Sequence, residues 1–308
     1  MTLTRTLIVF LCLQITLLCG EDLSGTQDWT RAKDNNSISA SLLSFDLDQD
    51  RVSLKLKNGK VVDIKASILI PAHIARLEQL DSENKAKQEA ASKPRLSSHT
   101  PEGGGGFKVH VYKPAGYIDD SPSSKTRPIA ILYTGSGRSI TVVDRLKAAS
   151  DELGWVLVGV DAYKNTSSLE DRYEERMEHT KTAFEWIRNN ISFDPNKMVF
   201  GGMSGGAWWS YQSASDLTKE AAAILAFGGW MGNMHDKKYS RKMAVAMVNG
   251  DKDKNALSYE EKDGDFLKRK ASCTVKTFHF PGAHILAPSE VALEAARWIH
   301  TTKKFAQP

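Results

Sequence analysis

The sequence predicts an α/β fold, a doubly wound and mostly parallel sheet, preceded by a small β domain. Two observations lead to this fold class. Residues 107–305 alternate short apolar runs with segments of helical periodicity, whereas residues 26–82 carry the two-residue alternation of half-buried strands. Strands that alternate with helices favour a parallel sheet with both faces covered.

The composition is that of an ordinary globular protein. Of 308 residues, 41% are hydrophobic and 25% are charged, which excludes wholesale disorder and collagen-like structure. Lys and Arg number 41 against 37 Asp and Glu, for a net charge of +4. So small an excess, without a long basic block, argues against a nucleic-acid partner.

Residues 1–20 read as a secretory signal peptide. Arg5 gives a positive start, Leu7–Leu18 is an apolar run too short to span a bilayer, and Gly20 offers a small residue for cleavage. The alternatives are an uncleaved signal anchor and lipidation at Cys19. We therefore expect a secreted, periplasmic or cell-envelope protein with no transmembrane span in its mature chain.

Cysteine usage agrees with core burial as the source of stability. Cys12 and Cys19 fall within the signal, so the mature chain keeps only Cys273 and cannot form an internal disulfide. We expect Cys273 to be a small core residue and not a nucleophile.

The small domain reads as β structure that ends in a short helix. Asn58-Gly59 is the dipeptide that tight hairpin turns prefer. We expect strands at Ser39–Phe45, Val52–Lys57 and Val61–Ile64 and a helix at Ile74–Leu80.

Trp29 followed by the stretch DRVSLKLKNGKVVDIKASIL (Asp50–Leu69) resembles the SLA-type homology domain, an SH3-like barrel of secreted proteins in planctomycete-type bacteria. The resemblance implies a small interaction module with a protein partner; a spacer without a partner is the alternative. We expect Trp29 to lie in its core.

Residues 83–106 predict a flexible linker. The segment is rich in Lys, Ser, Ala, Pro and Gly, and it ends in four glycines, Gly103–Gly106.

The large domain alternates strand and helix patterns. We expect strands at Phe107–Tyr112, Ile129–Tyr133, Trp155–Val160, Met198–Gly202, Ala222–Phe227, Met243–Val248 and Val275–Phe280, and helices at Val142–Leu153, Leu169–Asn190, Ala207–Ala214 and Pro288–Thr302.

The motif that carries chemistry is Gly202-Met203-Ser204-Gly205-Gly206. It matches G-x-S-x-G, follows a predicted strand and precedes a predicted helix, which is the context of a nucleophile elbow. The helix N-terminus favours developing negative charge near Ser204. The alternative is a glycine-rich turn without chemistry.

A serine nucleophile needs a base, and the base needs an orienting group. Histidines stand at positions 73, 99, 110, 179, 235, 279, 284 and 300. His284 is best placed, because it follows the last strand and the carboxyl ends of parallel strands share one edge. His235 is expected to line a pocket. For the acid, Asp253 is favoured over Asp251, and either gives the chain order Ser–Asp–His.

An oxyanion hole requires two N–H donors. Gly205 supplies the first, as the residue after the nucleophile. The second is expected from the loop Thr134–Arg138, with Ser136 first and Gly137 second. Arg138 is a candidate contact for an acidic or polyol substrate, or a solvated rim residue.

Together these motifs resemble the α/β-hydrolase family, and within it secreted polyester depolymerases and feruloyl or acetylxylan esterase-like enzymes. The resemblance rests on FDPNKMVFGGMSGG (Phe193–Gly206), NGDKD (Asn249–Asp253) and PGAH (Pro281–His284). It implies Ser204 as nucleophile, Asp253 as acid and His284 as base. Many relatives carry His-Gly where this chain has Thr134-Gly135.

These observations favour an exported serine esterase without metal or cofactor, acting on a small-molecule or polymeric, such as carbohydrate-linked, ester. Trp230 and Met203 are candidate pocket residues. Core packing is expected for Trp208 or Trp209. The alternatives are a catalytically weak hydrolase-like binding protein of the cell envelope and a peptidase on the same fold.

Overall fold

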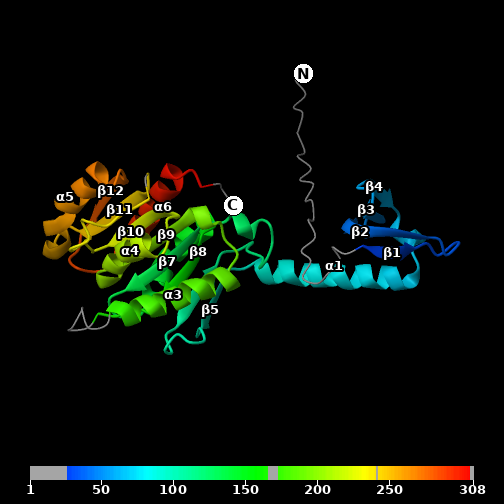
Figure 1. Ribbon diagram of the computed structural model, residues 1–308, viewed down its shortest axis with the longest axis horizontal. Helices are drawn as coiled ribbons and strands as arrows, with labels where there is room; N and C mark the ends of the chain where they lie inside the picture. Colours follow the sequence, from blue (N-terminus) through cyan, green and yellow to red (C-terminus); the bar gives the residue numbers. More distant parts are fainter. Residues whose placement is uncertain (1–25, 166–172, 241, 306–308) are drawn as a thin grey trace, which may run out of the picture. The chain divides into compact units, whose positions relative to one another are not determined.

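The computed structural model describes residues 26–165, 173–240 and 242–305 (Figure 1). The predicted signal peptide lies outside the described residues, and so does the predicted start of a helix at Leu169. The chain divides into two compact units, Met1–Glu89 and Ala90–Pro308. None of the described helices combines the length and the apolar content that crossing a bilayer needs.

The first unit contains a four-stranded antiparallel sheet in the order β1-β2-β3-β4. Gly59 takes a φ of +81° in the turn between β3 and β4, as the Asn-Gly dipeptide predicted. The elements are β1 (Gln27–Thr30), β2 (Ser37–Asp46), β3 (Arg51–Leu56), β4 (Val61–Ile64), the 3-10 turn η1 (Ala66–Ile68) and α1 (Pro71–Ala91).

Trp29 lies in the core of the first unit, as expected. Its side chain is 2% exposed and its Nε1 donates a hydrogen bond to the carbonyl of Ala40, 3.1 Å away. Leu54 from β3 and Leu77 from α1 belong to the same apolar cluster. Trp29 therefore stabilises this unit and is not a ligand platform.

The prediction of a flexible linker over 83–106 was wrong for much of that segment. Helix α1 continues to Ala91, and the strand β5 (Arg95–His99) pairs antiparallel with β6 (Val109–Lys113). Ala, Lys, Glu and Gln are strong helix formers, so a lack of large apolar residues did not mean a lack of structure. The second unit consequently begins near residue 90, before the predicted boundary at 107.

The second unit is built on an eight-stranded sheet in the order β12-β11-β10-β9-β7-β8-β6-β5. The six strands from β12 to β8 are parallel to one another, whereas β6 is antiparallel to β8 and β5 is antiparallel to β6. The sheet is therefore mostly parallel, as predicted. The remaining strands are β7 (Ile129–Thr134), β8 (Val156–Val160), β9 (Met198–Met203), β10 (Ala221–Phe227), β11 (Ala244–Gly250) and β12 (Thr274–Phe280).

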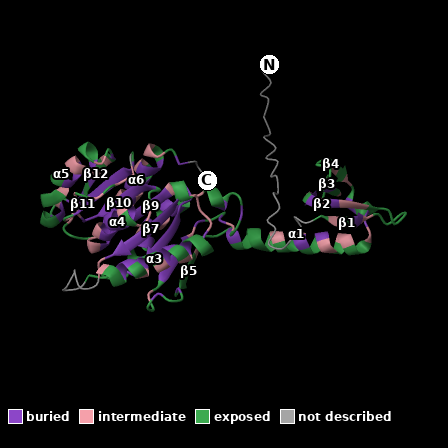
Figure 2. Ribbon diagram, in the orientation of Figure 1, coloured by how far each residue is buried: buried purple, intermediate pink, exposed green. Residues whose placement is uncertain are grey.

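Helices cover both faces of this sheet, and its central strands are buried (Figure 2). On β7, Ile131 and Tyr133 join the core beneath α3 and α4, whereas Leu132 joins the core beneath α2 and α6. The helices are α2 (Ile140–Leu153), α3 (Tyr173–Asn190), α4 (Gly205–Asp216), α5 (Lys254–Arg269) and α6 (Ser289–Thr302), with 3-10 turns η2 (Ser124–Thr126) and η3 (Pro195–Lys197). The sequence did not predict α5, because few of its residues are large and apolar.

Candidate active site

Ser204 stands on a sharp turn between β9 and α4. Its backbone has φ 58° and ψ −122°, a conformation that side chains rarely adopt and that stores strain. The Ser204 N–H donates to the carbonyl of Phe227 on the neighbouring strand, 2.9 Å away. The turn therefore fixes the hydroxyl at the carboxyl edge of the sheet, as the elbow motif predicted.

The two outer glycines of the motif allow the strand and the helix to approach closely. A Cβ atom on Gly202 would lie 2.7 Å from the carbonyl carbon of Gly206, and one on Gly206 would lie 2.4 Å from the carbonyl carbon of Tyr133. Real Cβ atoms do not approach backbone at such distances. The glycines are thus a steric requirement of the elbow.

Ser204, His284 and Asp253 form one hydrogen-bonded chain. The Oγ of Ser204 lies 2.8 Å from Nε2 of His284, and Nδ1 of His284 lies 2.7 Å from Oδ2 of Asp253. Asp253 is 2% exposed, and its other oxygen accepts the N–H of Ala256 as the N-cap of α5. The helix start and the imidazole therefore hold this carboxylate from two sides.

Asp251, the alternative acid, does not contact the imidazole. Its Oδ1 accepts the N–H of Gly282, 3.0 Å away, in the loop that leads to His284. Asp251 therefore fixes the loop before His284, whereas Asp253 contacts the imidazole itself.

Some backbone N–H groups near Ser204 already donate hydrogen bonds to other described residues, and others do not. Gly205 begins α4, where the first N–H groups of a helix have no intrahelical acceptor. In the loop after β7, the N–H of Gly137 donates to the carbonyl of Thr134 and the N–H of Gly135 to that of Met203, both at 3.3 Å. The Ser136 N–H has no acceptor among the described residues, which favours Ser136 over Gly137 as the second donor.

The Thr134 hydroxyl organises this loop from within. It accepts the N–H of Arg138 at 2.9 Å and lies 3.2 Å from the hydroxyl of Ser136. Thr134 itself is buried, whereas Ser136 and Arg138 are exposed. The Thr134 side chain thus fixes the loop that carries Ser136.

We expect Thr134→Val to lower kcat about tenfold, the effect of losing a hydrogen bond of about 1–2 kcal/mol that positions the donor loop. Thr134→Ser keeps the hydroxyl and should stay close to the parent in steady-state ester hydrolysis. Equal kcat values for the two variants would contradict this role.

The comparisons with known proteins agree with this architecture. No protein-family model and no curated protein matches the chain. Among solved structures, an alpha/beta hydrolase enzyme from a Medee basin deep-sea metagenome library is 14% identical and covers 69% of this chain and 99% of its own, with a TM-score of 0.53. The chain has the α/β-hydrolase fold.

Two further structures of this fold are similar. A thermophilic esterase from the Planctomycetes species Thermogutta terrifontis, with butyrate bound, is 16% identical, covers 71% of this chain and 97% of its own, and has a TM-score of 0.51. The S-formylglutathione hydrolase FrmB from Staphylococcus aureus is 11% identical, covers 69% and 97% and also has a TM-score of 0.51. Many structural neighbours are esterases or hydrolases of α/β-hydrolase type.

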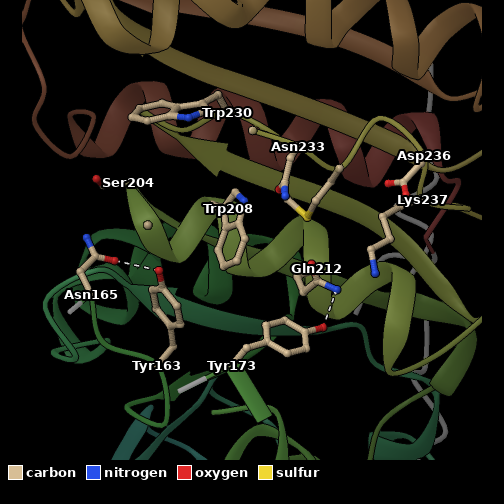
Figure 3. A pocket seen from close by; sticks show the side chains of 13 residues that line it. Tyr163, Asn165, Tyr173, Ser204, Trp208, Gln212, Trp230, Asn233, Asp236 and Lys237 are labelled. Atoms are coloured by element: carbon tan, nitrogen blue, oxygen red, sulfur yellow. Dashed lines mark hydrogen bonds between the residues drawn. The ribbon is translucent and has the colours of Figure 1, made fainter. Parts of the chain in front are cut away.

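Two cavities meet at Ser204 on this α/β-hydrolase unit. The larger, of about 870 Å³, runs past Trp208 and Trp230 (Figure 3). The smaller, of about 580 Å³, contains His284 and Met203. Both therefore open onto the predicted nucleophile.

The predicted pocket residues fare differently. Trp230 and Met203 line the cavities, as expected, whereas Arg138 is exposed and lines neither of them. Of the two alternatives for Arg138, its exposure favours a solvated residue over a substrate contact. Arg145 on α2 lines the smaller cavity instead.

The far end of the larger cavity is a polar cluster. The Tyr173 hydroxyl donates to Asp216, 3.0 Å away, and Lys237 forms a 3.1 Å ion pair with the same carboxylate. Gln212 donates to the Tyr173 oxygen at 2.9 Å. Burial, then the Asp216 hydrogen bond, raises the pKa of Tyr173 to about 12, so the phenol stays protonated.

Asp263 on α5 anchors the loop that carries Trp230. This fully buried carboxylate accepts the N–H of Met231 at 2.7 Å and lies 2.8 Å from Nε2 of His235. Burial raises the pKa of Asp263 above its ordinary value. His235 was predicted to line a pocket; it instead pairs with Asp263 and does not line either cavity.

Sequence reasoning missed two residues around the nucleophile, Asn165 and Tyr163. Asn165 follows β8, whose carboxyl end lies on the same edge as that of β9. A search for polar residues just past each buried strand could have found it. Trp209 is fully buried, but its neighbour Trp208 lines the cavity.

Cys273 does not have the environment of a reactive thiol. Cys273 is buried, and burial raises the pKa of its thiol to about 11, which keeps it protonated. Across the residues that the structure describes, no cluster of three or more His, Cys, Asp or Glu could hold a metal ion.

Proposed function

We propose that the protein is an exported serine hydrolase that cleaves carboxylic esters through Ser204, His284 and Asp253. The observation that carries the proposal is the hydrogen-bonded chain from Asp253 through His284 to a serine on a strained elbow. Beside it, the N–H groups of Gly205 and Ser136 have no backbone acceptor within the described part of the chain. The fold and the esterases that share it agree with this reaction class.

The reaction follows from these positions. The Oγ of Ser204 attacks the ester carbonyl carbon while Nε2 of His284 takes the hydroxyl proton. Asp253 holds the imidazole by Nδ1 and stabilises its charged form. The N–H groups of Gly205 and Ser136 stabilise the oxyanion, and the proton on His284 passes to the leaving alcohol. Water, activated by His284, then hydrolyses the acyl-enzyme.

The larger cavity supports an extended substrate. Its volume of about 870 Å³ exceeds that of a short acyl chain, and its wall includes Tyr163, Trp208 and Trp230. Trp230 stacks on Tyr259 with ring centroids 5.4 Å apart, which steadies one aromatic face. Aromatic walls that end in the polar side chains of Tyr173, Gln212 and Lys237 suit an ester with a carbohydrate or other hydroxyl-rich group.

Export and a partner for the first unit are parts of the same proposal. The pattern of residues 1–20 supports secretion or a place in the periplasm or cell envelope. The small antiparallel sheet agrees with the resemblance to an SH3-like interaction domain, and we assign this unit the role of binding a protein partner near the substrate.

The test is covalent labelling combined with hydrolysis. The purified protein should hydrolyse p-nitrophenyl acetate or butyrate and take up one equivalent of a fluorophosphonate, which mass spectrometry should locate on Ser204. Ser204→Ala should remain folded but neither hydrolyse nor react. Hydrolysis that survives in Ser204→Ala, or a label on another residue, would refute the assignment.

A further inference from the structure

Asn165 occupies a position that the triad does not explain. It lies just past β8, its side chain is exposed, and it lines both cavities that meet at Ser204. Figure 3 shows one end of its amide turned to the Tyr163 hydroxyl. The side chain therefore borders the place where an ester carbonyl must sit.

The Asn165 amide is wedged between the two segments that carry the oxyanion donors. A Cβ atom on Gly205 would lie 2.0 Å from its Oδ1, and one on Gly135 would lie 2.6 Å from its Nδ2. The backbone N–H of Asn165 also donates to the carbonyl of Gly135, 2.8 Å away. Gly205 is itself a proposed donor and Gly135 precedes Ser136, so the amide borders both segments that supply the donors.

The hydrogen bond from Tyr163 fixes the orientation of the Asn165 amide. Its hydroxyl donates to Oδ1 of Asn165 at 2.8 Å, and its ring stacks on Trp209 with centroids 4.9 Å apart. Burial raises the pKa of Tyr163 to about 12, so the hydroxyl keeps its proton and remains a donor. Oδ1 is thus engaged as an acceptor, and the two N–H bonds of Nδ2 have no acceptor among the described residues.

We propose that Nδ2 of Asn165 is a third, side-chain donor to the oxyanion, positioned by the Tyr163 hydroxyl. The inference rests on the proposed function. As the bond from Ser204 Oγ to the carbonyl carbon forms, the π electron pair moves to the carbonyl oxygen and the serine proton moves to His284. Nδ2 donates to that oxygen together with Gly205 and Ser136, and its bond strengthens as the charge develops.

The experiment compares Asn165→Ala and Asn165→Asp with the parent in steady-state hydrolysis of p-nitrophenyl butyrate. Losing one oxyanion donor should lower kcat by about 10²-fold with little change in KM, because the bond forms fully only in the transition state. Binding of a phenylboronic acid, which mimics the tetrahedral state, should weaken in parallel. Asn190→Ala removes an equivalent amide from the surface of α3 and should leave kcat unchanged.

Tyr163→Phe separates positioning from packing. It removes only the hydroxyl, so we expect kcat to fall about tenfold at constant KM, the effect of one lost hydrogen bond. The double variant Tyr163→Phe/Asn165→Ala should be no worse than Asn165→Ala, because both changes act through one donor. Additive losses would contradict a positioning role.

The outcomes separate this inference from the proposed function. An inactive parent that takes no fluorophosphonate refutes both. The parent can instead be active while its Asn165 variants keep kcat within twofold, or show only a higher KM or a lower unfolding midpoint. That result refutes the third donor and leaves the proposed triad intact.

Discussion

Asp253→Asn should lower kcat by about 10⁴-fold while the protein stays folded. The carboxylate lies 2.7 Å from Nδ1 of His284. In the proposed mechanism it holds the imidazole in the tautomer that can accept the serine proton. An amide can donate to that nitrogen and stabilise the wrong tautomer, which is the physical source of so large a loss. Asparagine is also a good N-cap, so the bond to the N–H of Ala256 and the start of α5 should survive.

Asp251→Asn is the matched control for this substitution. It makes the same chemical change two residues away, on a side chain that accepts the Gly282 N–H and does not touch the imidazole. The asparagine oxygen can still accept that bond, so we expect kcat within about threefold of the parent. Steady-state kinetics and unfolding midpoints of both variants test which aspartate is the acid. A large loss of kcat in Asp251→Asn alone would assign that role to Asp251 and not to Asp253.

The sequence could predict the centre of the sheet because buried strands have a plain signature. Ile129–Thr134 and Val156–Val160 are buried at every position, and such short apolar runs between helical patterns indicate strands that are covered on both faces. The elbow was predictable for the same reason: strand, turn and helix are adjacent in the chain. The histidine and the acid followed from their places after strands that end on one edge.

The elements at the margins lacked such a signature. β5 exposes most of its side chains at the sheet edge, and α5 buries little large apolar surface. The latter half of α1 is polar and exposed, so composition alone suggested a linker. Such segments owe their order to propensity, capping and edge pairing, which leave weak traces in hydrophobic periodicity.

The residues that line the cavities could not be predicted from the sequence for a different reason. Asn165 acquires its place from Gly135 and Gly205, which are 30 and 40 residues distant in the chain, and from the Tyr163 hydroxyl. No spacing rule connects these positions. Arg138 shows the converse, since it is near the donor loop in sequence but outside both cavities.

Gly206→Ala should destabilise the second unit by about 3 kcal/mol, at the upper end of the usual cost of overpacking. The added Cβ would lie 2.4 Å from both the carbonyl carbon and the oxygen of Tyr133 and 2.5 Å from the amide nitrogen of Thr134. These are backbone atoms of a buried central strand, so no side chain can turn aside to make room. Relief requires α4 to move away from β7, which also displaces Ser136 and Ser204 relative to each other.

Gly264→Ala supplies the opposite result from the same chemical change. Gly264 lies within α5, and a Cβ atom there would meet nothing within 4 Å. Alanine is the better helix former by about 1 kcal/mol, so this variant should be as stable as the parent or more stable. The urea concentration at the unfolding midpoint and the rate of ester hydrolysis should therefore both fall in Gly206→Ala. Neither quantity should fall in Gly264→Ala. Equal stability of the two variants would mean that the close approach of α4 to β7 is not required by the elbow, and that Gly206 could accept a side chain without loss of the site.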